Sequence, residues 1–171
     1  LMVGHIHPFR NPVQLVRAMP IVLKQVPTAR LVLAGRVDLQ EPVKAARELG
    51  LTEDQVRFLG PTPHNAVVEL MKTSHAYASY VTGPYPGLGT APMEAMLCGV
   101  PVLNDLPENL FGEGRLKNGE NIVLVNSRDP KAQLVRTIMS SGRLNLLNAL
   151  NGVYPPSNEP AESDWIDGDA I

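Results

Sequence analysis

The chain has 171 residues, of which 44% are hydrophobic and 19% are charged, and its formal net charge is −2. This composition is typical of a soluble globular domain, and the length suffices for one domain with its own core. The charge argues against a dedicated nucleic-acid binder, the lone Cys98 excludes an intrachain disulfide, and no apolar run approaches the roughly 20 residues that span a bilayer.

Charge is distributed unevenly along the chain. Residues 153–171 hold five acidic residues and no Lys or Arg, which leaves 15 basic and 12 acidic residues in the rest. The mildly positive remainder suits a small anionic ligand. The acidic end also has tandem prolines and little periodicity, so we expect a folded domain over residues 1–152 and a flexible tail over residues 153–171. The chain opens within an apolar run and lacks a signal-peptide pattern, so we expect it to be a piece of a longer protein.

Short apolar runs alternate with helical patterns along most of the chain. In chain order we predict a strand ending at 3–4, a helix over 12–26, a strand over 30–34, a helix over 41–49, a strand over 56–59, a helix over 64–71, a strand over 76–81, a helix over 91–98, strands over 100–103 and 120–125, and a helix over 130–150. Pro20 lies inside the first helix and is expected to kink or split it. The alternation predicts an α/β fold with a doubly wound, Rossmann-like parallel sheet in three layers, α/β/α.

A glycine-rich loop between a strand and a helix is the most informative segment. In doubly wound folds the ligand lies outside the carboxyl ends of the strands, where such loops are found. Gly87 and Gly89 remove Cβ atoms that would keep a ligand from the backbone. The N–H groups of 88–91, with the helix dipole behind them, favour a phosphate. Glu94, one turn into the helix, could accept hydrogen bonds from ribose hydroxyls.

Simpler interpretations of the same residues remain open. The two glycines lack the third glycine of a dinucleotide fingerprint and can serve the turn alone. Glu94 can instead cap its own helix by reaching back to the N–H of Ala91. His64 and His75 are expected to cap or pack locally, because no metal-ligand spacing links them.

The segment GLGTAPMEAMLCGVPV, at 87–102, resembles the signature of retaining glycosyltransferases of the GT-B fold, the "group 1" family. Three further segments resemble that family in the same order: VGH at 3–5 with RNP at 10–12, the strand from Arg30 that ends at Gly35, and VRFLGP at 56–61. The resemblance covers about residues 1–150. It implies that this chain is the C-terminal, nucleotide-sugar-binding half of a GT-B fold.

The resemblance implies a role for each matching position, and all of them concern the donor. Glu94 matches the second glutamate of the family's paired-glutamate motif and would bind the ribose. The remaining implied donor-binding residues are Gly4, His5 and Arg10 toward the diphosphate, Pro61 and Thr62 at the edge of the nucleobase, and Gly87, Leu88, Gly89 and Thr90 toward the phosphates and sugar. No residue is assigned as certainly catalytic; Arg10 and His5 are expected to stabilise the departing diphosphate.

Two positions depart from the family pattern. The family's first glutamate falls eight residues before Glu94, where this chain has Pro86, whose side chain cannot receive a sugar hydroxyl. His5 replaces the family's phosphate-binding arginine, and a histidine is only partly charged at neutral pH. A location at a strand end with no ligand is the alternative for His5, and it is favoured for His7.

The resemblance implies a hexosyltransferase that takes a sugar from a nucleoside diphosphate sugar with retention and needs no metal. Its acceptor site would lie mainly in an N-terminal domain that is absent here, so the chain alone would show little activity. One alternative is a degenerate nucleotide-sugar-binding or assembly module without catalysis, and a weaker one is a nucleotide-sugar epimerase. We expect no nucleic-acid partner, no transmembrane segment and a cytoplasmic location, with peripheral membrane attachment of the whole protein left open. The base, sugar and acceptor stay open too.

Overall fold

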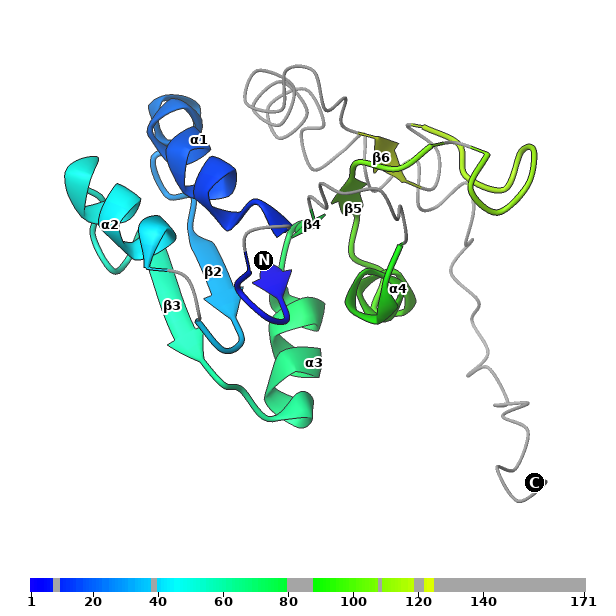
Figure 1. Ribbon diagram of the computed structural model, residues 1–171, viewed down its shortest axis with the longest axis horizontal. Helices are drawn as coiled ribbons and strands as arrows, with labels where there is room; N and C mark the ends of the chain where they lie inside the picture. The colour runs from blue at the N-terminus through cyan, green and yellow to red at the C-terminus, as the bar shows by residue number, and fades with distance from the viewer. Residues whose placement is uncertain (8–9, 38–39, 80–87, 108, 119–121, 125–171) are drawn as a thin grey trace.

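The computed structural model describes residues 1–7, 10–37, 40–79, 88–107, 109–118 and 122–124 (Figure 1). These residues form alternating strands and helices, as predicted. The strands are β1 (Met2–Val3), β2 (Leu31–Ala34), β3 (Val56–Gly60), β4 (Tyr77–Ser79), β5 (Val102–Asn104) and β6 (Val123–Leu124). The helices are α1 (Pro12–Gln25), α2 (Glu41–Glu48), α3 (His64–Thr73) and α4 (Thr90–Leu97).

All paired strands are parallel, in the orders β1-β2-β3 and β4-β5-β6. Main-chain hydrogen bonds join the two sets between β1 and β4. The N–H of Ala78 donates to the carbonyl of Leu1 over 2.8 Å, and the main-chain nitrogen of Leu1 donates to the carbonyl of Ala76 over 2.9 Å. The strands therefore follow one another as β3-β2-β1-β4-β5-β6, and the winding direction reverses between β1 and β4. This order confirms the predicted doubly wound sheet.

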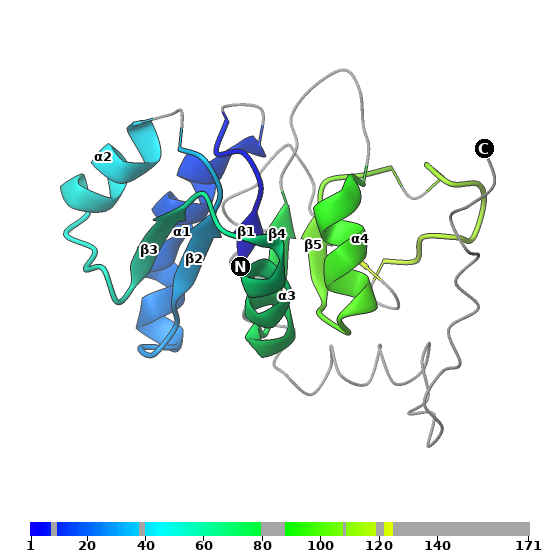
Figure 2. The same cartoon turned by 90° about the horizontal axis from the view of Figure 1, so that it is seen from below.

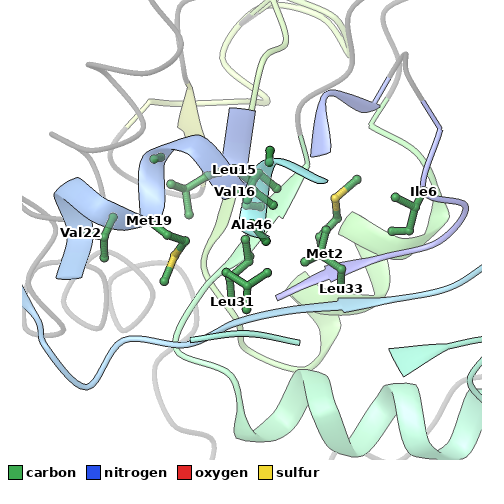
Figure 3. Close-up of a cluster of buried hydrophobic side chains, with 14 residues drawn as sticks. Met2, Ile6, Leu15, Val16, Met19, Val22, Leu31, Leu33 and Ala46 are labelled. Carbon is green, nitrogen blue, oxygen red and sulfur yellow. The ribbon is translucent and has the colours of Figure 1, made fainter. Parts of the chain in front are cut away.

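Helices cover both faces of the sheet. In Figures 1 and 2, α1 and α2 lie on one side, and α3 and α4 lie on the other. Successive strand residues alternate between the two cores, as the period of a strand requires: Met2 and Leu33 belong to the α1 side, and Val3 and Ala34 to the α3 and α4 side. Figure 3 shows the core of the α1 side, which includes Met2, Ile6, Leu15, Val16, Met19, Val22, Leu31, Leu33 and Ala46.

The structure corrects two predicted elements. Pro20 lies inside α1 but does not split it, and Val16, four residues before it, and Val22, two residues after it, are both buried in the core. We attribute the unbroken helix to this packing, which offsets the hydrogen bond that a proline removes. The strand predicted from 100 begins at Val102 instead, because the N–H of Val100 bonds to the carbonyl of Ala95 over 2.9 Å at the end of α4.

Several predictions fall partly or wholly outside the described residues. They are the end of the strand at 76–81, part of the strand at 120–125, the helix at 130–150 and the tail at 153–171. The division of the chain into 1–152 and 153–171 stays a prediction.

Candidate functional site

The ends of β1 and β2 come unusually close together. Gly35 has a φ of +145°, and Gly4 has a φ of +111°. A Cβ atom built on Gly35 would overlap the carbonyl oxygen of Gly4, so a residue with a side chain cannot replace it without moving the backbone. The N–H of Gly4 donates to the carbonyl of Ala34 over 2.8 Å. The predicted site residue Gly4 thus lies in a tightly fixed turn at the carboxyl edge of the sheet.

Arg10 lies over this turn. A Cβ atom built on Gly4 would be 3.5 Å from the Cζ and Nη1 atoms of Arg10, so the guanidinium stacks against the glycine backbone. Asn11, which follows, has a φ of +48°, a left-handed conformation that asparagine tolerates better than most residues. It turns the chain into α1. Two predicted diphosphate residues, Gly4 and Arg10, are therefore neighbours in space.

His5 is paired with an arginine that the sequence did not single out. The Nε–H of Arg36 donates to Nε2 of His5 over 3.1 Å. Because arginine can only donate, this nitrogen is the acceptor of the bond. His7 lies beside it, with 5.9 Å between the ring centroids, and is exposed. The one sequence signal for Arg36 is its place directly after the strand end at Gly35.

The N-terminus of α4 lies on the same carboxyl edge, because helices between parallel strands run antiparallel to them. Gly89 is the N-cap with a φ of +80°, and no side chain caps the helix. Gly89 and Thr90 are exposed, whereas Leu88 is buried in the core. An uncapped helix N-terminus can hold an anion with its backbone N–H groups. Gly87 and Pro86 lie outside the described residues.

Glu94 faces a residue from another helix. Its Oε1 atom is 3.3 Å from Nε2 of His64, the first residue of α3. Among the described residues the carboxylate makes this contact rather than a bond to Ala91, so the helix cap, the alternative left open above, is not formed. The local role expected for His64 is wrong as well, because its contact joins residues 30 apart in sequence. His75 is exposed after the other end of α3.

A buried tyrosine lies between the two groups of predicted site residues. The Tyr77 hydroxyl donates to the carbonyl of Val3 over 3.1 Å and thereby links β4 to β1. Burial raises the pKa of Tyr77 to about 12; the bond to Val3 and the charge of Arg10 lower it, and the charge of Glu94 raises it. Arg10 and Glu94 are thus both within electrostatic range of one hydroxyl at the point where the winding reverses.

Pro61 and Thr62 follow β3 and lead into α3. The Thr62 hydroxyl donates to the carbonyl of Gly60 over 2.9 Å, which closes the turn after the strand. His64 comes two residues later. The loop predicted to edge the nucleobase is therefore adjacent in sequence to the histidine that contacts Glu94, the residue predicted to bind ribose.

Two polar residues at the end of β5 were missed by sequence reasoning. Asn104 is fully buried, and neither atom of its side-chain amide has a hydrogen-bond partner in the described part of the protein. Burial raises the pKa of the neighbouring Asp105. The sequence signal that could have identified these two residues is a polar pair at the end of an apolar strand. Such a pair lies at the carboxyl edge of the sheet, where ligands bind in doubly wound folds.

Within the ranges that the structure covers, no group of three or more His, Cys, Asp or Glu side chains could hold a metal ion. Among the same residues, none of the helices has the length and apolar character needed to cross a membrane.

Comparison with known proteins agrees with the resemblance seen in the sequence. A family model described as "Glycosyl transferases group 1" matches residues 1–140. A D-inositol 3-phosphate glycosyltransferase from Frankia alni is 31% identical over 140 residues, which are 76% of this chain and 33% of that protein. The chain spans about a third of the length of the curated relatives it matches.

Solved glycosyltransferase structures share the fold. The C-terminal domain of a group 1 family glycosyl transferase (LpcC) from Francisella tularensis has a TM-score of 0.66 at 20% identity, covering 90% of this chain and 84% of that chain. A mutant TarM from S. aureus, in complex with fondaparinux, alpha-GlcNAc-glycerol and UDP, has a TM-score of 0.65 at 16% identity, covering 91% of this chain and 32% of that chain. The predicted fold class, a Rossmann-like half of a GT-B fold, is confirmed.

Proposed function

The chain belongs to the group 1 family of glycosyl transferases, and we propose that it is the donor-binding half of a retaining enzyme. The whole enzyme takes a sugar from a nucleoside diphosphate sugar and transfers it to an acceptor. The N-terminal domain that completes the cleft supplies most of the acceptor site. Neither the donor nor the transfer step requires a metal ion in this proposal.

One observation carries the proposal: cationic side chains and an uncapped helix N-terminus lie at the same edge of the sheet, on either side of the reversal between β1 and β4. Arg10 lies over Gly4 at the end of β1, and α4 begins at Thr90 without a side-chain cap. A diphosphate carries charge on both of its phosphates, so it can be held by a guanidinium on one side and backbone N–H groups on the other. These groups stabilise the diphosphate as it departs, and the protein contributes chiefly by positioning.

The remaining predicted residues fit the nucleoside. Glu94 lies one turn along α4, where its carboxylate accepts hydrogen bonds from the ribose hydroxyls, and 61–62 line the edge of the base. UDP is the first nucleotide to test, because the TarM structure that shares this fold contains it. The lone cysteine suits a reducing compartment, and we place the protein in the cytoplasm, with any membrane contact made by the whole enzyme.

Calorimetric titration with UDP, GDP and ADP tests this function. We expect at least one of them to bind in the millimolar range or tighter, and Glu94→Ala to weaken that binding. Absence of binding by all three contradicts the donor site. Unchanged affinity in Glu94→Ala contradicts the ribose role alone.

A degenerate module without catalysis is the second candidate, favoured by His5 in place of the family's arginine and by the bond that its Nε2 accepts from Arg36. Incubating the full-length protein with several nucleotide sugars separates the two, since a transferase hydrolyses its donor slowly and a degenerate module does not. An epimerase, the weaker third candidate, would instead convert the sugar nucleotide without any acceptor.

A further inference from the structure

We propose that His64 is a positioning residue for Glu94, so that nucleotide affinity depends on an imidazole that does not itself contact the nucleotide. This inference rests on the proposed donor-binding function. It deepens that function by assigning the group that orients the ribose-binding carboxylate.

Both partners are held on regular secondary structure. His64 is the first residue of α3, and the N–H of Val67 donates to the carbonyl of Pro63 over 3.0 Å in the turn that follows. Glu94 lies in α4, and its carbonyl accepts the N–H of Cys98 over 3.0 Å. The two helices pack on the same face of the sheet, where Val67 is buried in one core cluster with residues of α4. The 3.3 Å contact is therefore set by helix packing.

The distribution of charged groups around Glu94 identifies His64 as the partner of its carboxylate. Glu94 is the sole charged residue of α4, and the turn at 61–62 is uncharged. On α3, Lys72 pairs with Glu69, 3.0 Å away toward the other end of the helix. From β4, the pKa of the Tyr77 phenol is raised by the charge of Glu94 and lowered by that of Arg10. Among the described residues, His64 is the one group that can become cationic within hydrogen-bond distance of Glu94.

A carboxylate needs this support to bind a ribose. A free glutamate side chain samples several rotamers, and ordering it upon binding costs free energy. The imidazole contacts Oε1, which leaves Oε2 and the second lone pair of Oε1 for the ribose hydroxyls. An imidazole N–H at Nε2 can donate to the carboxylate.

The pair is partly exposed to solvent, with 73% of the His64 side chain and 39% of the Glu94 side chain accessible. Exposed ion pairs contribute little, so the expected effect is small but measurable. We expect His64→Ala to weaken UDP binding about two- to fivefold. His64→Gln, which keeps a donor, should recover most of the affinity.

The experiment is a calorimetric titration of the 171-residue chain with UDP. The variants are His64→Ala, His64→Gln, Glu94→Gln, the double variant His64→Ala with Glu94→Gln, and His75→Ala. His75 is an exposed histidine beyond the other end of α3, so its variant is the matched control and should bind like the wild type. Thermal unfolding of each variant shows that the fold is retained. A second titration uses the dideoxy analogue of UDP, which lacks both ribose hydroxyls.

The proposal predicts that His64→Ala has no further effect in the Glu94→Gln background or on the dideoxy analogue. If His64→Ala binds UDP as tightly as the wild type does, the positioning role is overturned, whereas the donor site is not contradicted. An equal loss for UDP and its dideoxy analogue also overturns it, because His64 would then act on another part of the nucleotide. If UDP does not bind, GDP and ADP replace it, and failure of all three overturns both the donor site and this inference.

Discussion

Arg36 donates its Nε–H to Nε2 of His5 over 3.1 Å, so the contact joins the residues that follow the glycines at the ends of β1 and β2. His5 occupies the position where the resembling family has an arginine. The guanidinium of Arg36 therefore places a permanent charge beside the position of that arginine. The positive charge at this edge is retained although it comes from a different strand.

Replacing Arg36 tests whether that charge serves the diphosphate. We expect Arg36→Ala to weaken UDP binding about fivefold or more, by roughly 1 kcal/mol for a lost hydrogen bond that carries charge. Arg36→Lys should retain part of the affinity, since it keeps the charge but not the planar fork. The matched control is Arg57→Ala, because Arg57 is exposed and pairs locally with Asp54. Equal affinities for all of these variants would show that Arg36 has no role in binding.

Gly35→Ala tests the close approach of β1 and β2. The added methyl group would overlap the carbonyl oxygen of Gly4, so the strand ends must separate. We expect a loss of about 3 kcal/mol or more in the free energy of unfolding, measured by urea denaturation. Gly50→Ala is the control, because Gly50 also has a positive φ, +65°, but nothing lies near its Cβ position. It should cost only about 1–2 kcal/mol. Similar losses in both variants would contradict the overlap.

Tyr77→Phe tests the junction of β1 and β4 through its pH dependence. The pKa of Tyr77 is raised from 10.0 to about 12, chiefly by burial, so the folded protein holds the phenol proton more tightly than the unfolded chain. The stability from this group is fully present below about pH 10 and is lost as the pH rises from about 10 to 12, in total about 2–3 kcal/mol.

Urea denaturation at neutral and alkaline pH measures this effect. Between about pH 9 and 11 the wild type should lose more stability than Tyr77→Phe, which lacks the titrating group. At neutral pH the variant should be about 1 kcal/mol less stable, because the bond to Val3 is lost. Parallel alkaline losses in the two proteins would show that Tyr77 does not titrate in this way.

Asn104→Leu tests the buried amide at the end of β5. Its nitrogen and oxygen are both without hydrogen-bond partners among the described residues, so an apolar side chain of similar shape should stabilise the fold by about 1 kcal/mol. Asn104→Asp should destabilise it, because an ionised carboxylate in that position is buried without a partner. Both are measured by thermal unfolding. Destabilisation by Asn104→Leu would show that the amide is satisfied after all.

The order of elements could be predicted because it depends on local periodicity. The apolar stripe that predicts α1 and the alternation between strands and helices are properties of neighbouring residues. The start of β5 could not be predicted in this way, because it depends on the hydrogen bond that Val100 makes back to α4. The persistence of α1 through Pro20 depends similarly on packing across the core.

The candidate site likewise has residues that could be predicted from the sequence and a contact that could not. Gly4, Arg10, Gly89 and Glu94 were found from the residues that follow predicted strands and from the family resemblance. The contact between His64 and Glu94 joins two helices, and no spacing within the sequence encodes it. Contacts of this kind can be predicted only once the strand order is known, because the strand order decides which helices are neighbours.

The most direct test of the central claim is a crystal structure of this chain with UDP. We predict the pyrophosphate at the N-terminus of α4, within hydrogen-bond reach of the backbone N–H groups of Gly89 and Thr90 and of the Arg10 guanidinium, with the ribose against Glu94. A nucleotide bound elsewhere on the molecule, or an α4 N-terminus filled by the protein's own side chains, would contradict it.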